Sequence, residues 1–123
     1  MSKNTVVWTD IPVIDLPRAI AFYAKVLAAQ IELQNFGEHS MGVLPHAGDG
    51  SSGCLTPSEE NKPSRTGPLI YLTVDGRLDE AEKLAGENGG EILEPKHPIG
   101  PYGFRSVILD SEGNRIALHS QTA

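Results

Sequence analysis

The order of predicted elements repeats in the two halves of this chain, and this repeat constrains the fold more than any single motif. In each half, a strand of apolar and β-branched residues precedes an amphipathic helix, and three strands follow. The segments "VIDLPRA" and "VDGRLDEA", which lead into the two helices, are about 60 positions apart. Few residues are identical, so the repeat is one of pattern. We expect two βαβββ modules, at about 5–56 and 68–120, with a polar connector at 57–67.

The two helices each present one apolar stripe. In "DLPRAIAFYAKVLAA", Asp15 is a suitable N-cap and Pro17 fits a first turn. In "LDEAEKLAGENGG", the glycine pair at 89–90 ends the helical pattern. The residues that recur at helical spacing, and that we expect to be buried, are Leu16, Ala19, Ile20, Tyr23, Val26 and Leu27 in the first helix and Leu78, Ala81, Leu84 and Ala85 in the second.

The strands alternate between an aliphatic face and a mixed face. In "NRIALHS", Ile116 and Leu118 share one face, whereas Arg115, Ala117 and His119 share the other. The same alternation separates Val7, Ile11 and Val13 from Trp8, Asp10 and Pro12, and Ile70, Leu72 and Val74 from Leu69, Tyr71 and Thr73. We expect the aliphatic faces to pack against the helices and the mixed faces to line a groove or cavity, where ligand sites usually lie.

Composition indicates which classes of binding partner and which cellular compartment suit this protein. The 123 residues suit one domain, 1–123, and carry a net charge of −6. That charge disfavours a nucleic-acid or anionic-membrane partner, because both require a cationic surface. A single cysteine excludes an intrachain disulfide and suits a reducing compartment. The N-terminal "MSKNTVVWTD" has no long apolar run, so we expect a cytoplasmic protein.

Two motifs give the chain a family resemblance. "IPVIDLPRAIAFYAKVL" and "DSEGNRIALHS", set in the two βαβββ halves, resemble the glyoxalase / bleomycin resistance / dioxygenase family, also called the vicinal oxygen chelate superfamily. The resemblance implies an α+β fold in which the two modules form an incomplete, curled mixed β-barrel around a central cavity. It also implies a homodimer.

The resemblance also implies a metal site, but this sequence lacks the residues that usually bind the metal. Enzymes of the family usually hold a divalent ion with His or Gln, Glu, His and Glu, and those positions correspond here to Trp8, Cys54, Leu69 and Ala117. Of these side chains only a cysteine thiolate binds metals, and one ligand does not hold a divalent ion tightly. We therefore expect no metal cofactor, and not the family's metal-dependent lyase or ring-cleaving chemistry.

The favoured function is binding of a small organic molecule in the groove, as in the bleomycin-resistance branch. The alternative is a lyase- or dioxygenase-type enzyme with a displaced metal site or metal-free acid–base chemistry, for which Asp10 and His119 are the candidate catalytic residues. The candidate ligand-binding residues are Trp8, Asp10, Cys54, Leu69, Tyr71, Arg115, Ala117 and His119.

Several candidates have a purely structural alternative. Trp8 either stacks on a ligand or fills space. Asp10 either serves as a base or an anchor for a ligand, or pairs with Arg115 or Arg105, or lies in water at a strand end. His119 is either a base, a ligand in a rearranged site with Cys54 and Asp10, or a hydrogen-bonded strand end.

Two further features are interpreted mainly as structural. Cys54 fits a small buried residue better than a nucleophile. The stretch "HPIGPYGF", 97–104, either arches over the cavity mouth or only connects two strands.

Overall fold

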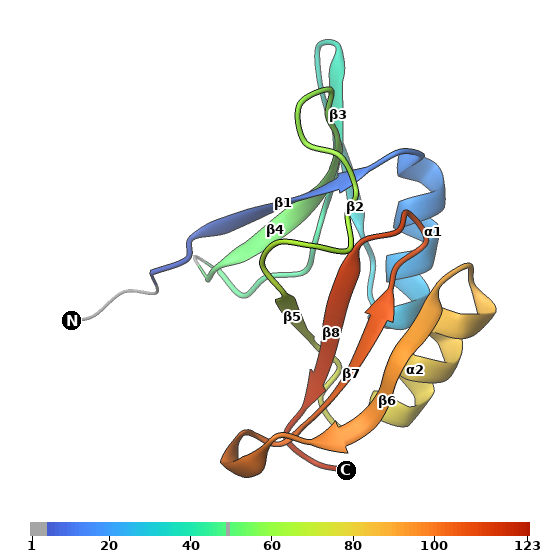
Figure 1. Cartoon of the computed structure of the whole chain (residues 1–123). Helices are drawn as coiled ribbons and strands as arrows, with labels where there is room; N and C mark the ends of the chain where they lie inside the picture. Colours follow the sequence, from blue (N-terminus) through green and yellow to red (C-terminus); the bar gives the residue numbers. More distant parts are fainter. Residues whose placement is uncertain (1–4, 49) are drawn as a thin grey trace.

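The computed structural model of the chain describes residues 5–48 and 50–123 and confirms the two βαβββ modules (Figure 1). The first module contains β1 (Trp8–Val13), α1 (Leu16–Val26), β2 (Glu32–Phe36), β3 (His39–Val43) and β4 (Ser52–Pro57). The second contains β5 (Ile70–Thr73), α2 (Leu78–Glu87), β6 (Glu91–Pro98), the short 3₁₀ helix η1 (Gly100–Tyr102), β7 (Phe104–Leu109) and β8 (Arg115–Ser120).

Each module forms one four-stranded mixed sheet. The strand orders are β1-β4-β3-β2 and β5-β8-β7-β6, in which β1 runs parallel to β4 and β5 parallel to β8. The fold is therefore α+β, as expected, and the two sheets are not closed into a barrel. Figure 1 shows both helices on the same side of the molecule, which leaves the opposite face of each sheet uncovered.

Helix α1 begins and packs largely as its sequence predicts. The Asp15 side chain accepts a hydrogen bond from the backbone N–H of Arg18 at 3.0 Å, and proline occupies the first turn. Phe22, which the predicted stripe omitted, is buried, whereas Ile20 and Leu27 are only partly buried. The buried face of α1 is therefore rotated about the helix axis relative to the predicted apolar stripe, because α1 packs against α2 as well as against its own sheet.

Gly90 permits the close approach at the end of α2. A Cβ at this position would lie 2.5 Å from the carbonyl oxygen of Leu109 and 2.9 Å from Cε1 of Phe22. Any larger residue would therefore push α1 and β7 away from the end of α2. On α2 itself Leu78, Ala81 and Ala85 are buried, as predicted, and Leu84 is partly buried.

The aliphatic strand faces form the core beneath the helices. Ile11, Val13, Val74, Ile116 and Leu118 are all at most 4% exposed and belong to one cluster with the helix side chains. The prediction for Val7 is wrong, because this residue precedes β1 and is 71% exposed. None of the helices in the described part of the chain is long and apolar enough to cross a membrane.

The turn between β7 and β8 fastens the second module to the first. Both Glu112 carboxylate oxygens are used: they accept bonds from the backbone N–H groups of Ile14 and Asp15, each at 2.8 Å, and from Arg18 Nε and Nη2 at 2.8 and 3.0 Å. Burial raises the pKa of this carboxyl, but the hydrogen bonds outweigh burial and lower the pKa to about 2. Glu112 is therefore ionised and holds the start of α1.

Two neighbours of Glu112 complete this inter-module contact. The buried Asp110 accepts a bond from the Tyr23 hydroxyl at 2.5 Å, and Asn114 Nδ2 donates to the carbonyl of Pro12 at 2.7 Å. Burial and the nearby Asp110 charge raise the pKa of Tyr23 well above its usual value. We call Asp110, Glu112 and Asn114 the module clamp. It fixes the end of β1, and thereby the position of β1 relative to β8.

Candidate functional site

A groove of about 1070 Å³ lies where the two sheets face each other across their edge strands β1 and β5. Its walls come from β1, the beginning of β4 with the residues before it, the connector at 61–66, β5 and the first residues of β8. The lining is not confined to the mixed faces, because Ile11, Ile70 and Leu72 of the aliphatic faces also contribute to it. Figure 1 shows β1 above and β5 below this region, with the connector passing between them. Because the groove has the size of a small-molecule site and is lined by both modules, it is the candidate functional site.

Five of the eight candidate residues line this groove: Trp8, Asp10, Leu69, Tyr71 and Arg115. Trp8 and Tyr71 are 44% and 47% exposed, so both rings are accessible to a ligand. The two rings lie on different modules, Trp8 on β1 and Tyr71 on β5.

Three candidates, Cys54, Ala117 and His119, do not line the groove. Cys54 and Ala117 are on the uncovered sheet faces, as predicted, but are only 1% and 0% exposed. They lie on the interior strands β4 and β8, where the register places the larger Asp10 beside Cys54 and Tyr71 beside Ala117. Neither side chain is therefore accessible to a ligand in the groove.

The four positions transferred from the family's metal site are not all neighbours. Trp8 pairs in register with Ser52, and Cys54 pairs with Asp10. Within residues 5–48 and 50–123, no three His, Cys, Asp or Glu side chains are grouped so that they could hold a metal ion. In particular, His119 is not brought to Cys54 and Asp10, so that proposed rearranged site is not formed.

Cys54 is a buried thiol. Burial, together with its hydrogen bond to Asp10 Oδ1 at 3.4 Å, raises its pKa to about 11, although contact with the Trp8 side chain acts in the opposite direction. The thiol is therefore protonated at neutral pH, which makes it a poor nucleophile and a poor metal ligand. Its interpretation as a small buried residue agrees with this environment.

Asp10 does not form the ion pair that was its structural alternative. Among the residues described, its carboxylate contacts the Cys54 thiol and forms no ion pair with Arg115 or Arg105. Arg105 instead donates from Nη1 to the Tyr71 hydroxyl oxygen at 2.5 Å and from Nε to His97 Nε2 at 3.0 Å. Among the described residues, Asp10 is thus left as the single carboxylate in the groove lining.

The network around Arg105 was not predicted from the sequence. Because His97 Nε2 accepts from Arg105, its Nδ1 carries the proton and donates to the Pro95 carbonyl at 2.9 Å. The alternation of side chains along β7 could have predicted from the sequence that Arg105 lies on the mixed face of the sheet. Its partner His97, however, lies on β6 beyond two register irregularities that sequence patterns do not reveal.

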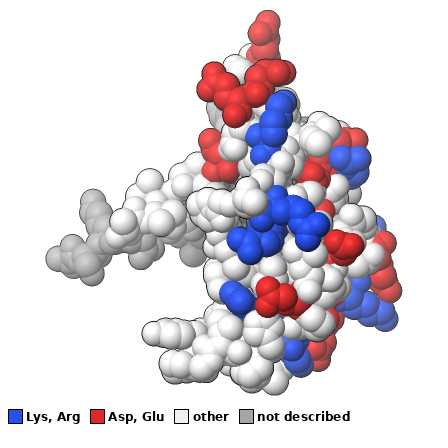
Figure 2. All heavy atoms as spheres, viewed as in Figure 1, with Lys and Arg blue, Asp and Glu red and all other residues white. Residues whose placement is uncertain are grey.

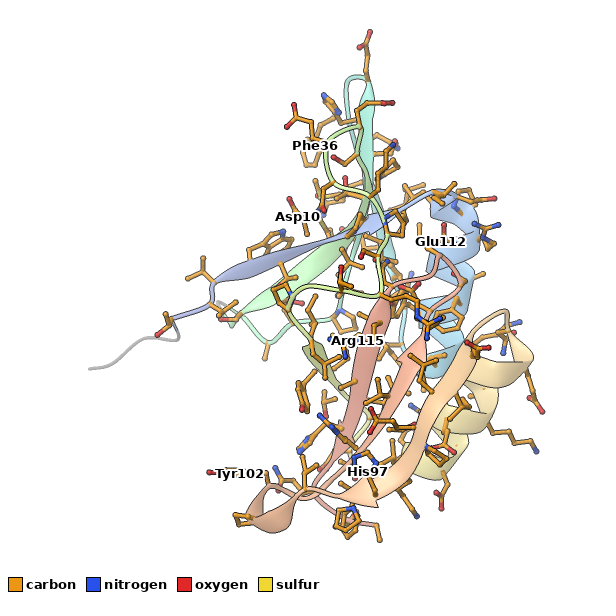
Figure 3. The ribbon with its side chains drawn as sticks, in the orientation of Figure 1. Asp10, Phe36, His97, Tyr102, Glu112 and Arg115 are labelled. Atoms are coloured by element: carbon orange, nitrogen blue, oxygen red, sulfur yellow. The ribbon has the colours of Figure 1, made fainter. Side chains whose placement is uncertain are left out.

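His119 is a hydrogen-bonded strand end, which was the structural alternative for this residue. Its Nε2 donates to the Tyr102 carbonyl at 2.6 Å. The stretch 97–104 that contains Tyr102 connects β6 to β7 and contributes nothing to the groove lining. Figure 3 shows Tyr102 at the far end of the second sheet, away from both Asp10 and Arg115.

The charge of the groove lining differs from that of the chain. Of the residues that the structure describes, the charged ones in the lining are Asp10, Lys62 and Arg115, two cations and one anion, although the chain carries −6. Lys62 Nζ is 4.0 Å from Glu59, whereas the Arg115 side chain has no hydrogen bond or ion pair to any other described residue. Figure 2 shows Lys and Arg side chains gathered over the beginning of β8.

A family model for the Glyoxalase/Bleomycin resistance protein/Dioxygenase superfamily matches residues 5–118, nearly the whole chain. The chain belongs to this superfamily. The resemblance in "IPVIDLPRAIAFYAKVL" and "DSEGNRIALHS" is thereby confirmed. None of the curated proteins compared with the chain matches it.

Solved structures of other superfamily proteins share this member's fold at low sequence identity. A glyoxalase/bleomycin resistance protein from Albidiferax ferrireducens matches with a TM-score of 0.74 and 15% identity, over 95% of this chain and 98% of that one. A glyoxalase-related enzyme from Fulvimarina pelagi gives 0.70 and 13%, over 96% and 88%. Glyoxalase I from Zea mays gives 0.69 and 18%, over 93% of this chain but only 45% of that one.

Proposed function

We propose that this superfamily member binds a small organic molecule in the groove between β1 and β5, without a metal cofactor. The observation that carries the proposal is the pair of accessible aromatic rings, Trp8 and Tyr71, which line the groove from different modules. Half-exposed aromatic side chains in a concave site offer apolar, stackable surface to a ligand.

The donor atoms near the groove do not fit the family's metal. At the four transferred positions only Cys54 has a donor atom, and the one carboxylate beside it is Asp10. A protonated thiol and one carboxylate fall short of the three or four ligands that hold a zinc-like ion. Metal-free acid–base chemistry is not favoured either, because His119 is engaged outside the groove.

We also propose that the protein is a homodimer. Outside the groove, the β2 side chains of Leu33 and Phe36 are 55% and 56% exposed. A second copy would remove such surface from water, which favours association. The net charge of −6 favours neither nucleic acid nor membrane as partner, and the single cysteine is consistent with a cytoplasmic location. Light scattering coupled to size exclusion should give twice the mass of 13.2 kDa, and a monomer would contradict this proposal.

The binding proposal is tested by thermal shift against a chemically mixed set of small aromatic compounds, with and without EDTA. We expect at least one compound to raise the Tm of the protein, equally in the presence of the chelator. Trp8→Ala should abolish that shift. Tyr102→Ala, which removes an exposed ring outside the groove lining, should not. A shift that requires added Zn, Ni, Fe or Mn, or none with any compound, would contradict the proposal.

A further inference from the structure

We propose that the molecule bound in the groove is a planar organic carboxylate, paired with Arg115 and packed against the rings of Trp8 and Tyr71. This inference rests on the proposed small-molecule function and assigns its ligand class. It is drawn from an arginine that has no partner among the described residues and from two accessible rings. These features occupy the same groove.

Arg115 and the exposed Arg65 are the two arginines whose side chains donate no hydrogen bond to another described residue, and of the two only Arg115 lines the groove. Arg18, Arg77 and Arg105 each donate to an acceptor within the protein, at distances of 2.5–3.0 Å. Arg115 is half-buried in the groove wall, and its backbone N–H is held by the Ser64 carbonyl at 3.2 Å. Its guanidinium contacts no acceptor elsewhere in residues 5–48 and 50–123. A guanidinium is always charged and its paired N–H groups match a carboxylate, so a ligand carboxylate would satisfy it.

Tyr71 contributes its ring to the same wall. Its hydroxyl oxygen accepts from Arg105 Nη1, and its ring centroid is 6.4 Å from that of His119, so the hydroxyl is engaged outside the groove lining. The guanidinium of Arg115 therefore supplies the donors for a ligand, and it favours a ligand that carries acceptor oxygens rather than donor groups.

The remainder of the lining favours a flat apolar body for the ligand. The Trp8 and Tyr71 rings and the Leu69 side chain offer apolar surface. Asp10, the one carboxylate that the described residues contribute to the lining, lies on β1, and Arg115 lies on β8 of the other sheet, as Figure 3 shows. An anion is therefore drawn to the β8 side of the groove, with its ring between the two modules.

Trp8 is the only tryptophan in the chain, so its fluorescence reports directly on the groove. The probes are three quenchers of the same size and different charge: 4-nitrobenzoate, the neutral 4-nitrobenzamide and the cationic 4-nitrobenzylammonium. We expect saturable quenching with the carboxylate bound at least about tenfold more tightly than the amide, and the cation bound more weakly than either.

Variants connect this preference to Arg115. Arg115→Gln should reduce carboxylate affinity to that of the amide, and Arg115→Lys should retain part of the preference, because it keeps the charge without the paired donors. Arg65→Gln, which removes an exposed arginine that does not line the groove, should leave the preference unchanged. Unchanged circular dichroism of each variant establishes that it is folded.

The outcomes separate the two proposals. A carboxylate preference that disappears in Arg115→Gln supports both. Equal affinity for the three probes, a preference for the cation, or a carboxylate preference retained in Arg115→Gln overturns the ligand class while leaving small-molecule binding in place. The absence of saturable quenching by any probe overturns the ligand class, and with no hit in the mixed thermal-shift set it also overturns the proposed function.

Discussion

The two modules meet on two sides of the molecule. On one side the polar groups are buried and hydrogen-bonded, and on the other side they are accessible. On the helix side, the module clamp of Asp110, Glu112 and Asn114 is buried, and each of its side chains is hydrogen-bonded to residues of the first module. On the groove side, aromatic rings are half exposed and Arg115 has no partner among the described residues. Satisfied polar groups hold a structure together, whereas unsatisfied ones in a concave surface remain for a ligand.

Two arginines show the difference most directly. Arg18 is half exposed and is neutralised by a carboxylate whose side chain is completely buried. Arg115 is half-buried and faces the groove instead. We therefore expect the clamp residues to stabilise the fold and the groove residues to recognise a ligand. Substitutions on either side test this expectation.

The largest expected effect is that of removing the clamp charge. Glu112→Gln should lower the free energy of unfolding by about 3 kcal/mol, because it disrupts a buried network of charge-assisted bonds. Urea denaturation measures this change. Glu59→Gln, which alters a fully exposed carboxylate, is the matched control. Equal stability of Glu112→Gln and Glu59→Gln would show that the clamp does not hold the modules together.

The same carboxylate should give the protein a distinct acid dependence. The Glu112 pKa is lowered from 4.5 to about 2 in the folded protein, so its stabilising contribution is complete above pH 4.5 and is lost as the pH falls towards 2. The loss amounts to roughly 2–3 kcal/mol. Unfolding measured between pH 6 and pH 2 should therefore show a smaller decrease in Glu112→Gln than in the unaltered protein, and parallel decreases would contradict the assignment.

A smaller effect is expected where the clamp meets α1. Tyr23→Phe removes the hydroxyl that donates to Asp110, at a cost of about 1–2 kcal/mol, because a buried carboxylate loses a donor. Tyr102→Phe is the control, since this tyrosine is 71% exposed. If denaturation midpoints of Tyr23→Phe and the unaltered protein coincide, the buried bond contributes nothing to stability.

The smallest effect should come from the groove side. Arg115→Gln should change the free energy of unfolding by less than about 0.5 kcal/mol, because its side chain contacts no acceptor in the described part of the protein. Differential scanning calorimetry at neutral pH provides the comparison. A loss as large as that of Tyr23→Phe would give Arg115 a structural role and remove the contrast between the two sides.

Five of the eight candidate residues predicted from the sequence line the groove, because strand alternation is a local property. Trp8, Asp10, Leu69, Tyr71 and Arg115 follow from period two along β1, β5 and β8, and all five line the groove. Alternation fixes the face of a side chain but not what covers it. Cys54 and Ala117 were therefore placed on the correct face and wrongly expected to be accessible.

The missed interactions join residues far apart in the chain. Glu112 lies 94 to 98 positions from its partners on the first module, and no local pattern in "DSEGN" predicts more than a turn. Arg105 and His97 are closer, but the irregular register of β6 hides their pairing.

The sequence by itself determined the two βαβββ modules, the faces of their strands and the family, since hydrophobic periodicity and short motifs are read along the chain. Only the tertiary structure decided which polar groups are satisfied. The clamp carboxylate and the groove arginine are three residues apart in sequence, at 112 and 115. One is enclosed by the first module and the other faces the groove, because partners and burial are set by packing between elements and not by local pattern.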